Sequence, residues 1–164
     1  MEIEEPEIEL NVPVDPEPVA QEPVQEIEPA ESRLPSPAEI RALIAEDLGV
    51  IESGLEIYTD KKGKPVGVSY PTQVGEIDIL ACDAQGALVV ILVADLGDEA
   101  DLATGVLQRM GWAKKHLDPG KNPVRGLILV ESVPDSLLYA ASALPASVGI
   151  RTYRMALCFD VVEA

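Results

Sequence analysis

The apolar positions along the chain first become periodic near residue 37. A helix is expected from there, because Ser36 can cap it, Pro37 suits its first position and Glu39 completes a capping box. The apolar residues of this segment recur three and four positions apart, at Ile40, Leu43 and Ile44. Gly49 then predicts the end of the helix.

Short strands follow. Residues 50–58 and 65–74 are expected to form two of them, around the polar turn 59–64. Residues 75–83 and 87–94 predict a hairpin, because Gly86 suits the left-handed position of a three-residue loop.

The hairpin register follows from that loop. Asp83 pairs with Ala87, which sets Asp78 opposite Leu92 and Glu76 opposite Ala94. The side chains of these two pairs, Asp78 with Leu92 and Glu76 with Ala94, are expected on one face of the sheet. The second strand, unlike the first, carries no polar side chain.

The rest of the chain alternates helix and strand. We expect a helix from Asp98 to about His116, a strand over residues 125–132, a helix over 134–144 and a strand over 149–159. A strand–helix–strand unit extends a sheet in parallel. The pattern therefore predicts an α/β fold, with an open mixed β-sheet flanked by helices on both faces.

Composition divides the chain into two parts. Residues 1–37 hold eight prolines and eleven acidic side chains against the single base Arg33, a net charge of −10. Such a composition cannot form a core, so residues 1–36 are expected to be a disordered, acidic, proline-rich tail and residues 37–164 the folded domain. Within the tail, Ile8, Leu10, Val12 and Val14 alternate with polar residues or proline. This segment is either a strand that docks on a partner's sheet edge or a solubilising linker.

Charge and cysteine content narrow the function classes. Residues 38–164 remain acidic, with eighteen acids and eleven bases, which makes a nucleic-acid or anionic-membrane partner unlikely on electrostatic grounds. The longest apolar run is eight residues, and the start lacks the features of a secretory signal. Cys82 and Cys158 stand in apolar contexts without metal-ligand spacing. We therefore expect a cytoplasmic protein without a membrane segment.

Four segments together carry a family resemblance. They are VIESGL, the hairpin GEIDILACDAQGALVVILVADLG, the helix through TGVLQRMGW, and NPVRGLILV. In order and spacing they resemble the C-terminal nuclease domain of NucS-like endonucleases, within the PD-(D/E)-x-K nuclease superfamily. The resemblance covers about residues 38–160 and implies a restriction-endonuclease-like sheet.

The resemblance also implies a site, and the sequence departs from it. In the family an Asp on the first hairpin strand and a Glu on the second bind a divalent metal, and a Lys two residues later assists the attacking water. Asp78 matches the Asp and Glu52 matches an upstream Glu, whereas Leu92 and Ala94 stand at the Glu and Lys positions. Two polar helix positions of the family likewise fall at or beside Val106 and Met110.

These losses lead to the prediction of a pseudo-nuclease. The domain is expected to cut no DNA, to need no cofactor, and to serve as a scaffold or adaptor subunit for protein partners. The first alternative is a DNA endonuclease with rearranged ligands, in which Asp78, Glu76 and Glu52 hold Mg²⁺ and Arg109 supplies the cation. The second alternative is an acidic DNA-mimic inhibitor.

A partner surface is predicted on the second long helix. Trp112 lies away from the apolar stripe of this helix and beside Gly105 and Gln108. An outward Trp among small neighbours is typical of a protein interface, whereas the other interpretation is a Trp packed under a loop. The sequence leaves oligomerisation open.

Overall fold

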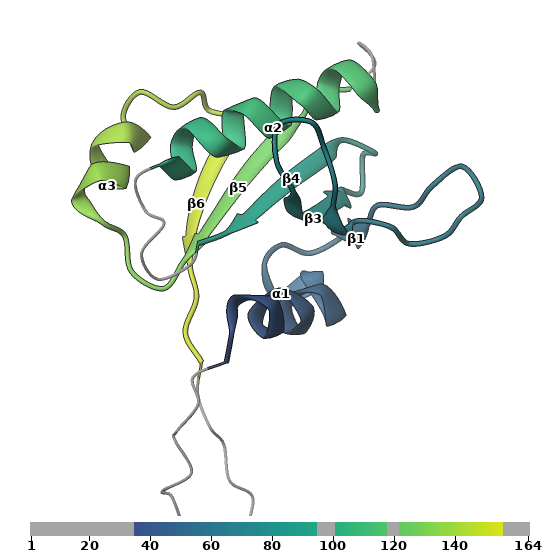
Figure 1. The fold of residues 1–164 in the computed structure, drawn as a ribbon, viewed down its shortest axis with the longest axis horizontal. Helices are drawn as coiled ribbons and strands as arrows, with labels where there is room; N and C mark the ends of the chain where they lie inside the picture. The colour runs from purple at the N-terminus through teal and green to yellow at the C-terminus, as the bar shows by residue number, and fades with distance from the viewer. Residues whose placement is uncertain (1–34, 95–100, 118–121, 156–164) are drawn as a thin grey trace, which may run out of the picture. The chain divides into compact units, whose positions relative to one another are not determined.

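The computed structural model describes residues 35–94, 101–117 and 122–155 (Figure 1). The elements are α1 (Pro37–Glu46), the 3₁₀ turn η1 (Leu48–Val50), β1 (Glu56–Ile57), β2 (Val68–Tyr70), β3 (Ile77–Cys82), β4 (Leu88–Val93), α2 (Leu102–His116), β5 (Arg125–Val130), α3 (Asp135–Ala141) and β6 (Val148–Thr152). The predicted alternation of helix and strand is confirmed.

One mixed sheet joins all the strands. Its order is β1-β3-β4-β5-β6, and β2 also pairs with β3. The pairs on β3 are antiparallel, whereas β4 with β5 and β5 with β6 are parallel. Parallel neighbours need a crossover, and α2 and α3 provide the two crossovers. The expected open mixed sheet is therefore present.

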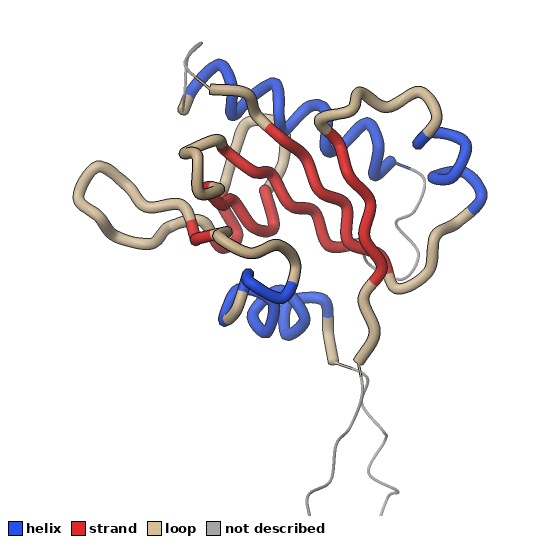
Figure 2. Tube along the Cα trace, turned by 180° about the vertical axis from the view of Figure 1, so that it is seen from behind, coloured by secondary structure: helices blue, strands red, loops and turns tan. Residues whose placement is uncertain are grey.

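The helices lie on opposite sides of this sheet (Figure 2). On one side, Ile40, Ile44 and Ala45 of α1 pack against a buried cluster that includes Ile79, Ile91 and Leu129. On the other side, α2 and α3 contribute to a larger cluster that includes Leu80, Val90, Leu92, Val106, Met110 and Leu137. Both faces of β4 are thus covered, which explains why its six residues are apolar and buried.

The hairpin of β3 and β4 has the predicted register. Gly86 adopts a φ of 80°, and the Asp83 N–H donates to the Ala87 carbonyl at 3.0 Å. The Asp83 carboxylate also accepts hydrogen bonds from the N–H groups of Gln85 and Ala87. Asp83 therefore fixes the turn with its side chain as well as its backbone.

The first strands are shorter than the sequence predicts. Helix α1 has the expected capping box but ends at Glu46, since Asp47 adopts a non-helical conformation and caps η1 through Gly49 N–H. Within the predicted strand 65–74 only Val68–Tyr70 forms a strand of the sheet, and β1 and β2 share β3, pairing with its two ends. Gly67 lies between them, where a Cβ would approach the Leu80 carbonyl oxygen to 2.0 Å.

Some expectations fall outside the described residues. The tail segment with Ile8, Leu10, Val12 and Val14, Asp98 at the expected start of α2, and Cys158 are among them. The boundary at residue 36 stays a prediction. None of the helices in the described ranges is both long and apolar enough to cross a bilayer.

Candidate functional site

Asp78 is the central side chain of the candidate site. One carboxylate oxygen, Oδ1, accepts a hydrogen bond from Arg41 Nη1 of α1 at 2.8 Å, and the other, Oδ2, accepts one from the Val93 N–H at 2.8 Å. The side chain of Asp78 is 14% exposed and that of Arg41 is 23% exposed. A nearly buried carboxylate is thus held between the first helix and the end of β4.

The strand geometry at Asp78 differs from the prediction. The pairing Ile79 with Ile91 confirms the register, but the ladder ends there. Ile77 packs on the α2 side although Ile79 packs on the α1 side, so the alternation of faces breaks between them. The Val93 N–H, which would face the Ile77 carbonyl in a continuous ladder, bonds to the Asp78 carboxylate instead.

This break corrects one sequence expectation. Asp78 was expected to share a face with Leu92, yet its carboxylate bonds to α1, whereas Leu92 belongs to the cluster under α2. The physical reason is the ion pair with Arg41, which needs the carboxylate on the α1 side. No periodicity in the sequence indicated that partner.

Burial sets the protonation behaviour of Asp78. Desolvation raises the pKa of its carboxyl, and this effect exceeds the lowering by the Val93 N–H, by Arg41 and by the more distant charge of Arg109. The ionised form therefore carries a net penalty in the folded protein. Such a perturbed carboxylate is a common property of catalytic and binding sites, because it accepts a proton more readily than a free one.

Arg109 brings a second guanidinium to this end of the sheet. Its Nε donates to the Glu76 carbonyl at 2.6 Å, and its Nη1 donates to the Gly105 carbonyl at 3.1 Å. A Cβ at Gly75, whose φ is 110°, would lie 2.6 Å from Arg109 Nη2. The glycine thus lets the arginine cross closely over the loop between β2 and β3.

The positions at which the resemblance implies polar residues are occupied by core side chains. Leu92, Val106 and Met110 are 5%, 0% and 8% exposed and pack in one cluster. Ala94, the residue after β4 and the last of the described range 35–94, is half-buried against the same cluster. The apolar residues at these strand and helix positions thus belong to one cluster, from which the Asp78 carboxylate turns away.

Glu52 does not join Asp78. Its carboxylate forms a bidentate pair with Arg125 at the start of β5, with Nη2–Oε1 and Nη1–Oε2 distances of 2.7 and 3.3 Å. Arg125 Nε also lies 3.3 Å from Asp83 Oδ2. This cluster ties the segment after α1 to the turn at the far end of β3 from Asp78.

Sequence reasoning missed the role of Arg125. Its segment, NPVRGLILV, carries the family resemblance, but nothing in the spacing linked it to Glu52, 73 residues away. The guanidinium pairs with carboxylates from two other segments, so Glu52 has a structural partner. The pair also raises the pKa of Arg125, chiefly through the hydrogen bond to Glu52.

The described residues do not provide a divalent metal site. Across residues 35–94, 101–117 and 122–155, no three His, Cys, Asp or Glu side chains gather closely enough to hold an ion. The predicted set of Asp78, Glu76 and Glu52 is separated, because Asp78 bonds to Arg41 and Glu52 to Arg125, and the Glu76 side chain is exposed. One carboxylate with an arginine on it does not fit a hard cation that takes six or more oxygens.

Trp112 lies under a loop, the other of its two predicted placements. Its Nε1 donates to Gln73 Oε1 in the loop between β2 and β3. Its ring centroid is 6.0 Å from that of Tyr70 and 4.9 Å from that of His116, on which it stacks. Gly105 is half-buried and accepts a hydrogen bond from Arg109, while Gln108 is exposed. The partner-binding role of Trp112, Gly105 and Gln108 stays a prediction.

Comparisons with known proteins point to one group of enzymes. No family model matches the chain. The curated endonuclease NucS of Kocuria rhizophila is 31% identical over 97 residues, which are 58% of this chain and 37% of that protein. The chain thus spans little more than a third of that relative, whose activity and partners are those of a longer protein.

Solved structures show the same fold. A repair endonuclease from Pyrococcus abyssi superposes with a TM-score of 0.56 at 23% identity, over 76% of this chain and 49% of that one. EndoMS in a complex with double-stranded DNA superposes with a TM-score of 0.54 at 19% identity, over 77% of this chain and 48% of that one. EndoMS in its apo form superposes with a TM-score of 0.53 at 18% identity, over 77% of this chain and 49% of that one.

These findings correct two sequence predictions. The non-catalytic scaffold or adaptor is wrong as the leading interpretation, because the relatives are endonucleases and no finding indicates an adaptor. The prediction that nucleic acid is an unlikely partner is also contradicted, since one structural neighbour was solved with double-stranded DNA. Net charge misled the second prediction, because it averages over a surface on which charges can be segregated. The first prediction rested instead on Leu92 and Ala94 at the family's Glu and Lys positions. In sequence and in fold, the chain resembles the nuclease domain of NucS-like endonucleases.

Proposed function

We propose that this chain is a nuclease-type domain that hydrolyses phosphodiester bonds in DNA, with Asp78 at its reactive centre. The observation that carries the proposal is the Asp78 carboxylate, almost buried and bonded to Arg41 at the end of the hairpin that carries the resemblance. Support comes from the endonuclease relatives. A cytoplasmic location is part of the same proposal.

The described side chains suit two parts of such a reaction. Burial raises the pKa of Asp78, so its carboxylate is a better proton acceptor for an attacking water than an exposed aspartate. Arg41 and Arg109 carry guanidinium groups that can pair with phosphate oxygens and offset charge as it develops. Water adds to phosphorus, Asp78 takes its proton, the bond to the leaving oxygen breaks, and that oxygen is protonated by solvent.

Arg41 has two roles in this scheme. In the structure it neutralises Asp78 with one nitrogen, Nη1, and its remaining N–H groups can bind a phosphate. When a phosphate draws the guanidinium away, the carboxylate loses its counter-ion and its affinity for a proton rises. Substrate binding therefore activates the base. No step of this scheme needs a metal ion, which the described residues do not fit.

A plasmid-nicking assay tests the proposal. Supercoiled DNA is incubated with the chain in three parallel conditions: Mg²⁺, Mn²⁺, and a chelator without metal. The scheme predicts nicking that Asp78→Asn abolishes and that Asp135→Asn, an exposed carboxylate on α3, leaves intact. Absence of nicking in all three conditions overturns the proposal, as does nicking that survives Asp78→Asn.

A further inference from the structure

Four rings from three elements form a continuous line, here called the aromatic row. Tyr58 follows β1, Tyr70 ends β2, and Trp112 and His116 lie one turn apart on α2. Successive ring centroids are 6.0, 6.0 and 4.9 Å apart, and the last pair is stacked with an interplanar angle of 24°. Burial raises the pKa of Tyr58, which keeps that phenol neutral.

The outer end of the row is a supported stacking surface. His116 is exposed at the end of α2, and one face of its ring lies on Trp112. Trp112 is itself half-buried and held by Gln73 and Tyr70. An exposed ring with a fixed ring behind it loses little side-chain freedom when another flat group stacks on it. Every nucleobase offers such a flat face.

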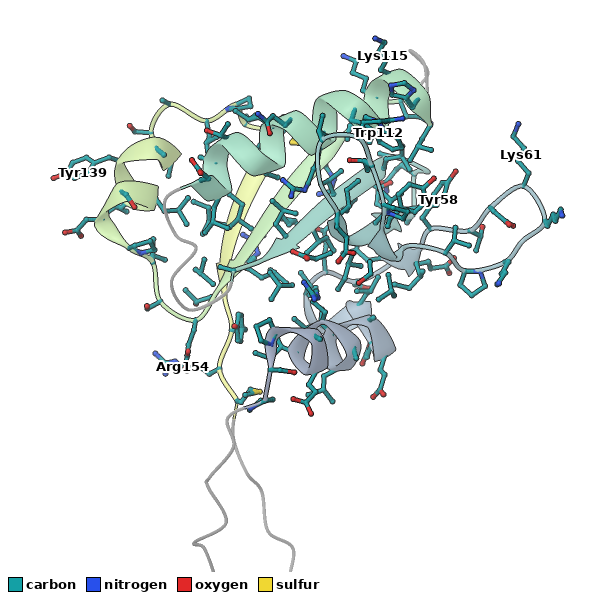
Figure 3. All side chains as sticks on the ribbon, in the orientation of Figure 1. Tyr58, Lys61, Trp112, Lys115, Tyr139 and Arg154 are labelled. Atoms are coloured by element: carbon teal, nitrogen blue, oxygen red, sulfur yellow. The ribbon has the colours of Figure 1, made fainter. Side chains whose placement is uncertain are left out.

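Lysines lie on two of the segments that bear the row, although the chain carries a net charge of −17. Five of its six lysines are exposed on the two segments that bear the row, namely Lys61, Lys62, Lys64, Lys114 and Lys115. In Figure 3, Lys61 projects from the loop beyond Tyr58, and Lys115 from the helix end beyond Trp112. Asp60 in the same loop is engaged, since its Oδ1 accepts the N–H groups of Lys62 and Lys64.

The row is also connected to the proposed reactive centre. Arg109, whose charge acts on Asp78, precedes Trp112 by about one turn of α2, and His116 follows one turn later. Seven residues of α-helix span about 10 Å. A strand bound by Arg109 can therefore continue along the helix to His116.

We propose that the aromatic row and its lysines form a second DNA-contact site, which holds a single DNA strand with a base stacked on His116. The site rests on the proposed function, because the strand it holds leads to Arg109, whose charge acts on Asp78. The lysines bind phosphates, and the exposed face of His116 takes a base. Base pairing removes this contact, since a paired base is stacked between its neighbours.

Trp112 gives this proposal a direct readout, because it is the sole Trp of the chain. The full chain with Asp78→Asn is titrated with a 15-nucleotide thymidine oligomer, and tryptophan fluorescence and oligomer anisotropy are followed. We expect quenching on binding, and a loss of affinity between about 5-fold and 150-fold in His116→Ala. Tyr139→Ala, an exposed aromatic on α3 that is 79% exposed, is the matched control and should change nothing.

A second measurement isolates the lysines. The logarithm of affinity for single strands falls with the logarithm of salt by about 0.7 per phosphate contact. The double variant Lys114→Gln, Lys115→Gln should reduce that slope by about 1.4. Both side chains are exposed on a helix, so the fold tolerates the change.

The outcomes separate this site from the proposed function. Nicking by the wild-type chain, together with oligomer binding that neither quenches Trp112 nor weakens in His116→Ala, overturns the aromatic row as a site and leaves the function intact. Quenching and weakening without any nicking supports the row and overturns the function. A duplex of the same length that binds as tightly and quenches equally contradicts the single-strand assignment.

Discussion

Gly126 supports the helix that carries both proposed sites, and its replacement by alanine is a stringent test of the fold. It lies in β5 directly under α2, where a Cβ would lie 2.6 Å from Met110 Sδ and 2.8 Å from Val106 Cγ2. The flexible Met110 can move, but Val106 is fully buried and has a stiff, branched side chain. The helix therefore has to shift, or the core has to strain.

The magnitude follows from overpacking. One inserted methyl group in a tight core typically costs about 1–3 kcal/mol of unfolding free energy. For a domain of this size, that corresponds to a fall in Tm of roughly 3–12 °C. Gly111→Ala is the matched control on the same helix, because a Cβ there meets nothing within 4 Å. It should raise stability by about 0.5–1 kcal/mol, since alanine favours helix over glycine.

Urea unfolding, followed by Trp112 fluorescence and by circular dichroism, measures both changes in the full chain. The two variants should move the midpoint in opposite directions, with Gly126→Ala below wild type and Gly111→Ala above it. A Gly126→Ala variant as stable as wild type would show that α2 does not pack on β5 as closely as described. The geometry of Arg109 and Trp112 would then need revision as well.

Two further predictions concern charged groups. Since the folded-state pKa of Asp78 is raised, the native state holds this proton at pH values where the unfolded chain has lost it, so stability falls as pH rises from about 3.8 through the folded pKa. Asp78→Asn should remove this part of the pH dependence. The measured quantity is the unfolding free energy of wild type minus that of the variant, which should fall between pH 3 and pH 7. If this difference stays the same across that range, the carboxylate is not buried as described. Arg125→Lys keeps the charge but cannot form the two parallel hydrogen bonds to the Glu52 carboxylate. Because both side chains are about one-third exposed, the free energy of unfolding should fall by only about 1 kcal/mol. Arg154 is an exposed arginine, so the control variant Arg154→Lys should unfold like wild type. If the two lysine variants are equally stable, the ion pairs of Arg125 with Glu52 and Asp83 do not stabilise the fold.

The fold was largely predictable because local signals agreed with one another. The capping box at Ser36, the left-handed Gly86 and the apolar strand of Leu88–Val93 each fix one element with its own chemistry. The two short strands β1 and β2 were overestimated, because their shared pairing with β3 and the close approach at Gly67 are tertiary facts.

The site was much less predictable, since its contacts join distant segments. Arg41 and Asp78 are 37 residues apart, and Arg125 and Glu52 are 73 residues apart. No periodicity marks such pairs, and parity placed Asp78 on the wrong face because an ion pair broke the alternation of the strand. Charge counting failed for a related reason: five of the six lysines are grouped in two short segments, whereas the acids are spread along the whole chain.

The proposed function depends most on Asp78 being a working carboxylate, and the nicking of supercoiled DNA tests this directly. Wild-type chain, Asp78→Asn and Asp135→Asn are compared at equal concentration in Mg²⁺, in Mn²⁺ and in chelator. The account predicts open-circular product from wild type and Asp135→Asn, and none from Asp78→Asn. Equal product from all three proteins, or from none of them, contradicts it.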